Sequence, residues 1–298
     1  MNKPYWTIIT LVLILFASCD HSSEGFEDDE SLSFIFHRGG GWIGLDEKLE
    51  ITEHTTEYSI RYHDLQMSAV ISQRSTAETS GILWAYLKKT FDWTSFTKIQ
   101  DGACRACVDG FDETFSVTKK EGTYSIYNGS SDEYYGQMQD FFDVMLAQAC
   151  ISGLSFSPSS GCSSFFVYKT GNTHHDNIGI AVMGNRENLH LSETEQVFDL
   201  SKTDQQDLKV EIKKLSSGSS GFYCDCVFEG ELLDTWIAQS GTVKIKIVQD
   251  YEGDPSAFEK PCTITVIIEN VVLQNDKGSP VIINYMEFND VGVGWLPG

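Results

Sequence analysis

The most definite candidate for chemistry in this chain is Cys104-Arg105-Ala106-Cys107, in which two residues separate a pair of thiols. Such a pair can form a local disulfide, supply half of a zinc site or act as a redox couple. A thioredoxin-like couple needs a strand before the motif and a helix after it, whereas here a loop leads into a predicted strand. A zinc site needs about four ligands, and only Cys224-Asp225-Cys226 offers further paired thiols. We predict a structural disulfide between Cys104 and Cys107, with no metal and no cofactor.

Further cysteines lie beside predicted strands at positions 162, 224, 226 and 262. In an oxidising compartment disulfides are the default state, so we expect an inter-strand bridge that uses Cys224 or Cys226. The pairing cannot be deduced from spacing alone.

No other group of residues requires an enzymatic interpretation. The chain lacks the His-Glu-x-x-His zinc motif, the Gly-x-Ser-x-Gly elbow, a phosphate-binding loop and a dinucleotide fingerprint. His174-His175-Asp176 is predicted to lie in a turn, and the acidic groups near Asp46 and Asp250 do not match a calcium-binding EF-hand loop. We predict that the chain is not an enzyme. A glycan-acting hydrolase stays an alternative, because its two carboxylates meet only in the folded protein.

The residues also suggest a site that binds a sugar or a protein partner. Arg38, Gly39, Gly40, Trp42 and Gly44 fall within one short run and form our candidate binding loop. An exposed Trp among glycines can stack on a sugar or anchor a protein partner, although a buried Trp is the commoner case. The same alternatives hold for Trp295 near the C-terminus.

The N-terminus has the features of a signal segment: Lys3, an apolar stretch from Tyr5 to Phe16, then the small pair Ala17-Ser18 before Cys19. The apolar stretch is shorter than the roughly 20 residues that span a bilayer. Phe16-Ala17-Ser18-Cys19 resembles the lipobox of bacterial lipoproteins, which implies removal of residues 1–18 and acylation of Cys19, for example with palmitate. We therefore predict a cell-envelope location, lipid-anchored to the outer membrane on its periplasmic or surface face. A plain secretory signal and a signal anchor are the alternatives.

Residues 19–31 are polar and acidic and are predicted to form a flexible tether. They resemble the acidic tract of surface-exported Bacteroidota lipoproteins, with a solvated spacer as the alternative. The whole chain has a formal net charge of −22. This charge disfavours nucleic acid, because binding to it depends on Lys and Arg neutralising phosphates, so we predict no nucleic-acid partner.

The elements that must position these residues fall into two parts. Residues 32–150 mix alternating strands with two helical stripes, which predicts an α+β domain with an antiparallel sheet and helices on one face. The stripes run over 83–91, with Ser80 as N-cap, and over 131–149. Residues 151–161 are rich in Ser and Gly and are predicted to be a linker. Residues 162–298 contain eight short strand patterns, which predict an all-β sandwich-like domain.

The run from Phe36 to Leu45, the helix near 83–91 and the closing helix near 135–146 resemble the emfourin family. Some emfourins inhibit thermolysin-like metalloproteases, so the resemblance implies a protease as a possible partner. This chain differs from the compact family pattern by an insertion over 53–80. The C-terminal part resembles an uncharacterised domain of lipoproteins from the same phylum. We therefore predict a non-catalytic binding or structural protein, with protease inhibition and glycan hydrolysis as alternatives and with a protein or a glycan as ligand.

Overall fold

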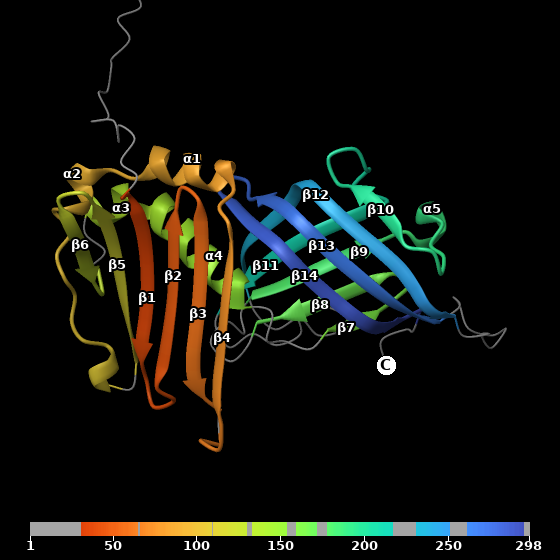
Figure 1. The fold of residues 1–298 in the computed structure, drawn as a ribbon, viewed down its shortest axis with the longest axis horizontal. Helices are drawn as coiled ribbons and strands as arrows, with labels where there is room; N and C mark the ends of the chain where they lie inside the picture. The colour runs from red at the N-terminus through yellow and green to blue at the C-terminus, as the bar shows by residue number, and fades with distance from the viewer. Residues whose placement is uncertain are drawn as a thin grey trace, which may run out of the picture.

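The structure is a computed structural model of the chain. It describes residues 31–64, 66–108, 110–129, 133–153, 159–171, 178–216, 231–250 and 261–294. The predicted signal, Cys19 and most of the tether lie outside the described residues, as do His174-His175-Asp176, Cys224, Cys226 and Trp295. Two antiparallel sheets lie side by side in the described part, with the long helix α4 reaching from one to the other (Figure 1).

The first sheet has the order β4-β3-β2-β1-β5-β6. Its strands are β1 (Ser33–Gly40), β2 (Leu45–Thr52), β3 (Thr55–His63), β4 (Val70–Glu78), β5 (Phe111–Lys119) and β6 (Gly122–Tyr127). Four helices cover one face, namely α1 (Gly81–Thr90), α2 (Trp93–Phe96), α3 (Glu133–Gln137) and α4 (Gln139–Gly153) (Figure 1). The predicted antiparallel sheet with helices on one face is confirmed.

Alternation along β2 shows why this sheet has one covered and one open face. Leu45, Leu49 and Ile51 are buried, whereas Asp46 and Lys48 between them are exposed. Successive side chains of a strand point to opposite faces, so the apolar set meets the helices and the charged set meets solvent.

The core under the helices is rich in aromatic rings. Phe34 of β1 lies 5.4 Å from Trp84, 5.4 Å from Phe91 and 5.2 Å from Phe141, measured between ring centroids. Helix α1 begins where predicted, because the Ser80 side chain accepts a hydrogen bond from the Ile82 backbone N–H. The second predicted helical stretch is divided into α3 and α4 at Met138.

The second sheet has the order β14-β13-β12-β11-β9-β8-β7, with β10 paired to β12. Its strands are β7 (Ser160–Cys162), β8 (Phe166–Thr170), β9 (Ile178–Gly184), β10 (Gln196–Asp199), β11 (Leu208–Leu215), β12 (Leu232–Asp250), β13 (Cys262–Gln274) and β14 (Pro280–Val293). A short helix, α5 (Arg186–Leu189), follows β9.

The sandwich expectation for this part is corrected by the topology. The described strands form one continuous curled sheet instead of two facing sheets. Its first and last strands approach each other: the Gly294 N–H donates to the Ser163 carbonyl, and a Cβ on Gly161 would lie 2.6 Å from the Gly292 carbonyl oxygen. A sheet that curls this far buries its inner face against itself. Its strands therefore show the same alternation of buried and exposed residues as the strands of a sandwich, so the sequence pattern does not distinguish the two folds.

The two sheets share their cores at α4 and β14. The Gln148 side chain donates to the Ile282 carbonyl and accepts from the Ile282 N–H, both at 2.9 Å. The hydroxyls of Tyr86 on α1 and Ser279 lie 2.9 Å apart. Ile282 belongs to the first core, whereas Ile151 of α4 belongs to the second.

The predicted linker over 151–161 is only partly irregular. Residues 151–153 form the end of α4, and residues 160–161 begin β7. Residues 154–158 lie outside the described part. Within the described ranges, no helix has both the length and the apolar character needed to cross a bilayer.

Candidate binding site at the loop end of the first sheet

Three connections meet at one end of the first sheet, away from α1 (Figure 1). They are the β1–β2 turn at 41–44, the β3–β4 turn at 64–69 and the segment at 103–110 before β5. The His63 N–H donates to the Ile43 carbonyl at 2.8 Å and ties the first two together. We call these three connections the loop end.

The glycines of the candidate binding loop allow a tight turn and a close approach of a neighbouring segment. Gly40 has φ of +106°, and a Cβ there would lie 2.6 Å from the Ala106 Cβ. Gly41 and Gly44 have φ of +66° and +60°. Only glycine takes such conformations freely, so these residues shape the turn and seat the disulfide segment against it. Gly39 lies within β1.

Exposed apolar side chains gather at the loop end. Trp42 is 59% exposed, Met67 50%, Val70 49% and Val108 80%. They make up four of the eleven large apolar side chains that the described residues expose. Such side chains held on rigid turns are typical of a surface that contacts a partner.

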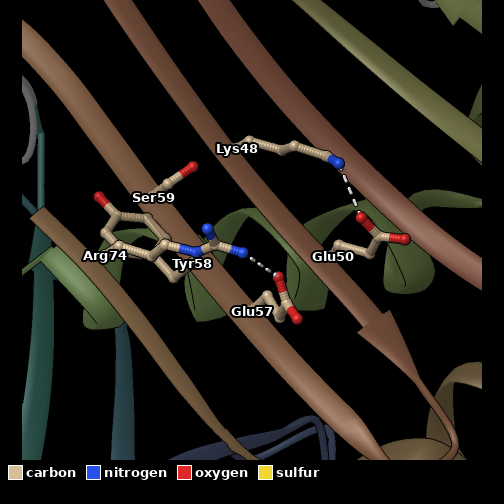
Figure 2. Close-up of a pocket in the computed structure, with 6 residues that line it drawn as sticks. All are labelled: Lys48, Glu50, Glu57, Tyr58, Ser59 and Arg74. Carbon is tan, nitrogen blue, oxygen red and sulfur yellow. Dashed lines mark hydrogen bonds and ion pairs between the residues drawn. The ribbon is translucent and has the colours of Figure 1, made fainter.

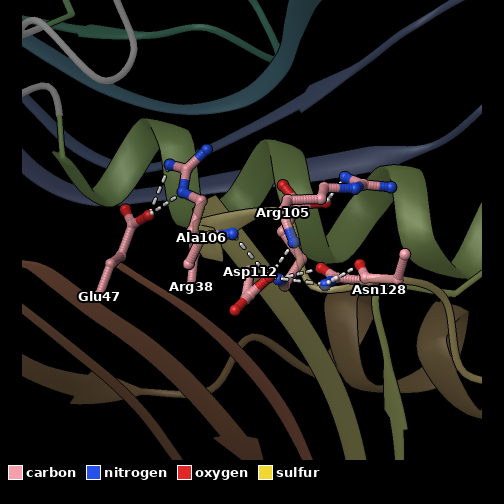
Figure 3. Close-up of polar contacts among 8 residues, drawn as sticks. Arg38, Glu47, Arg105, Ala106, Asp112 and Asn128 are labelled. Carbon is pink, nitrogen blue, oxygen red and sulfur yellow. Dashed lines mark hydrogen bonds and ion pairs between the residues drawn. The ribbon is translucent and has the colours of Figure 1, made fainter. Parts of the chain in front are cut away.

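The predicted disulfide between Cys104 and Cys107 is confirmed. Asp112 at the start of β5 holds the loop that carries it (Figure 3). Its carboxylate accepts from the Arg105 N–H at 2.7 Å, from the Ala106 N–H at 3.1 Å and from the Asn128 Nδ2 at 2.7 Å. The Tyr127 hydroxyl donates to its other oxygen. These hydrogen bonds, led by those from Tyr127 and Asn128, lower the pKa of Asp112 well below its ordinary value.

This lowered pKa predicts an acid-dependent loss of stability. The pKa of Asp112 is lower in the folded state than in the unfolded state. Its contribution to stability is therefore complete at pH values above the unfolded-state pKa, and it is lost as the pH falls through the folded-state pKa. Urea unfolding between about pH 5 and pH 2 should show wild type losing stability more steeply than Asp112→Asn. Asp276→Asn, in an exposed turn, serves as control and should follow wild type. Parallel curves for wild type and Asp112→Asn would contradict the prediction.

The disulfide itself should contribute modestly, because its cysteines are only three positions apart. In the chain-entropy treatment a loop this short gives about 2 kcal/mol. The double variant Cys104→Ser with Cys107→Ser is expected to lose about that free energy of unfolding while keeping the circular dichroism of the folded protein. A loss near zero, or complete unfolding, would contradict this prediction.

Arg38 is placed differently from the rest of the candidate binding loop. Its Nε and Nη2 donate to Glu47 Oε2 at 3.0 and 2.6 Å on the helix-covered side of the sheet (Figure 3). Tyr58 donates to the other Glu47 oxygen at 2.8 Å. Glu47 is fully buried and the Arg38 side chain is 14% exposed. Arg38 therefore belongs to a buried polar network, and Trp42 is the exposed side chain of the run.

The pKa values in this network follow from burial and charge. Burial is the largest single effect on the pKa of Arg38 and lowers it, but the surrounding groups, led by the Glu47 carboxylate, together outweigh burial, so this pKa is raised. Burial, followed by the charge of Glu47, raises the pKa of Tyr58 strongly. Sequence reasoning missed Glu47 and Tyr58 as partners of Arg38. The available signal was an acidic residue at an inward position of β2, between Leu45 and Leu49.

The open face of the sheet has a hollow of about 150 Å³ beside Lys48, Glu50, Glu57 and Arg74. Its charges already form pairs, with Lys48 2.7 Å from Glu50 and Arg74 3.1 Å from Glu57 (Figure 2). A ligand would have to compete with both pairs, so this hollow is a weaker candidate than the loop end.

In the described part of the chain, the remaining cysteines and the potential metal-ligating side chains form no second candidate site. Cys162 is disulfide-bonded. Burial raises the pKa of the Cys262 thiol, which makes that thiol a poor nucleophile. Among the residues that the structure describes, no three His, Cys, Asp or Glu side chains are grouped to hold a metal ion.

The chain matches no model of a known protein family and no curated protein sequence. The resemblances to emfourins and to bacterial lipoproteins therefore stay predictions. The geometry shows a loop end with exposed apolar side chains, among them Trp42, on turns that pack against the disulfide segment.

Proposed function

We propose that this protein is a non-catalytic, lipid-anchored component of the bacterial cell envelope that binds a protein partner through the loop end. The observation that carries the proposal is Trp42, which is 59% exposed on a turn braced by a neighbouring disulfide segment. A large aromatic side chain held rigidly costs little entropy on binding and is a common centre of protein interfaces. The acylated Cys19 would attach the chain to the outer membrane.

The binding part is tested by placing a photo-crosslinking amino acid at position 42 of the full chain in its native cells. We expect one defined crosslinked protein at position 42 and none at position 82. Ile82 on α1 is a matched control because it is also apolar and 48% exposed but lies at the other end of the first sheet. Equal crosslinking at both positions would refute a specific loop-end surface.

Once that partner is purified, Trp42→Ala should weaken its binding by about 2 kcal/mol or more, which is the size of an interface hot spot. Its free energy of unfolding should stay within about 0.5 kcal/mol of wild type, because an exposed side chain contributes little to folding. Titration calorimetry and urea unfolding measure the two quantities, and Ile82→Ala should leave binding unchanged. Unaltered affinity in Trp42→Ala would remove Trp42 from the interface.

The anchor is tested separately by labelling cells with radioactive palmitate. Wild type should incorporate the label and sediment with membranes, whereas Cys19→Ala should do neither. Labelling that persists in Cys19→Ala would place the lipid elsewhere.

Inhibition of a metalloprotease is a second proposal. A projecting turn with an apolar tip, fixed on a sheet and braced by a disulfide, has a shape that suits an enzyme cleft. A panel of thermolysin-like enzymes assayed with excess protein tests it. Full activity of every enzyme would rule out inhibition and leave the binding proposal standing.

A further inference from the structure

A hollow in the described part of the chain lies where the two sheets meet. It has a volume of about 260 Å³. Its walls come from β3, β4, α4 and β14, with Tyr58, Ser75, Ala77, Gln148, Asn284 and Tyr285 among its lining. We call it the seam cavity. Small-molecule sites form preferentially at such junctions, with volumes of about 300–1,000 Å³ for drug-sized ligands. The seam cavity lies just below this range, which limits it to a ligand smaller than a drug-sized molecule.

The walls of the seam cavity end at sheet edges. β4 is the last strand of the first sheet, and β14 is the last strand of the second. The floor is fixed, because Gln148 is bonded at both ends of its amide to Ile282. The cavity is therefore a preformed feature of the junction.

The lining of the seam cavity is uncharged and combines polar with apolar groups. Hydroxyl and amide side chains such as Ser75 and Asn284 lie among apolar ones such as Ile151 and Met286, and the apolar groups contribute the larger share of the surface. Among the described residues, no Asp, Glu, Lys, Arg or His lines the cavity, although 21% of the chain is charged. A charged ligand would lose its hydration without meeting an opposite charge, so the lining favours an uncharged one.

Tyr285 adds an aromatic ring to the cavity. The side chain is 57% exposed, and its hydroxyl donates to Glu287 at 3.2 Å. Because the hydroxyl is engaged there, the ring is what this side chain can offer to a ligand. Aromatic rings bury large apolar area, and a pyranose has apolar C–H faces of matching size.

We propose that the seam cavity binds a neutral saccharide, with one sugar ring seated between β4 and β14. The hydroxyls of the sugar exchange hydrogen bonds with hydroxyl and amide groups such as Ser75 and Asn284, and one of its C–H faces contacts the ring of Tyr285. This site is distinct from the loop end, since Val70 begins β4 at that end, whereas Ser75 lies near the middle of the strand and on its other face.

The proposal is tested on the purified full chain with an array of neutral and acidic glycans, followed by calorimetry with the best neutral binder. Ser75→Trp fills the cavity and should weaken binding by about tenfold or more. Ser72→Trp is the matched control, because it makes the same change on the same strand. Ser72 pairs with Arg61 and points to the open face, so its variant should bind like wild type.

Tyr285 supplies a second pair of variants. Tyr285→Ala should lower affinity by about tenfold, whereas Tyr285→Phe keeps the ring and should bind like wild type. Thermal unfolding confirms that each variant is folded. Binding of no neutral glycan at millimolar concentration, preference for acidic glycans, or equal affinity of Ser75→Trp and wild type would each overturn the proposal. Trp42→Ala should keep saccharide binding, so failure of this site and failure of the loop end are distinguishable.

Discussion

Glu47→Ala is expected to lower the free energy of unfolding by about 3–5 kcal/mol, because it removes one partner of a buried ion pair. Arg38 would keep its charge at a largely buried position with no carboxylate 2.6 Å away. The buried Tyr58 hydroxyl would lose its acceptor as well. Urea unfolding monitored by circular dichroism measures the loss.

A combined variant separates the cost of an orphaned charge from the value of the network. Arg38→Met, Glu47→Met and Tyr58→Phe together replace all three members by apolar side chains. Such replacements are often neutral or stabilising, so this variant should be markedly more stable than Glu47→Ala. If Glu47→Ala loses less than about 1 kcal/mol, water reaches the network and the ion pair is not effectively buried.

The second large effect is expected at the junction of the two sheets. Gln148→Leu keeps the size of a side chain that is 2% exposed but removes both hydrogen bonds to Ile282. Each buried backbone group left unpaired costs about 1–3 kcal/mol, and two are affected. Wild type should unfold in one transition, because the cores share α4 and β14. In Gln148→Leu the first sheet and the curled sheet should begin to separate into two transitions.

The matched control is Gln139→Leu on the same helix. Gln139 is exposed and donates to Asp143 one turn further along at 2.8 Å. Its replacement should change stability by no more than about 0.5 kcal/mol. Equal effects of the two substitutions would show that the bonds to Ile282 do not couple the sheets.

The predictions that the structure confirms depend on neighbours along the chain. A Cys-x-x-Cys pair can close its own disulfide, so Cys104 and Cys107 were identifiable from spacing. Ser80 caps α1 because the N–H it accepts from belongs to Ile82, two residues later. Alternation in β2 and β3 reveals which face is buried, since strand geometry repeats every two residues.

Strand β4 was missed because its pattern is weak. Its sequence from Val70 to Glu78 is mostly polar, and its side chains are largely exposed. An edge strand pairs on one side only and needs few apolar residues, so periodicity does not reveal it. The register with β3, from Thr55 opposite Glu78 to His63 opposite Val70, exists only in the folded sheet.

Composition and local pattern thus determined the two β-rich parts, the helix start and the local disulfide. Tertiary structure alone decided that Arg38 is buried against Glu47 while Trp42 is exposed, that the second part curls into one sheet, and that a neutral cavity lies between the sheets. The physical reason is the distance along the chain between the residues that interact. Local geometry depends on residues within a few positions, whereas burial, sheet closure and cavities depend on contacts between residues such as Gln148 and Ile282, which are 134 positions apart.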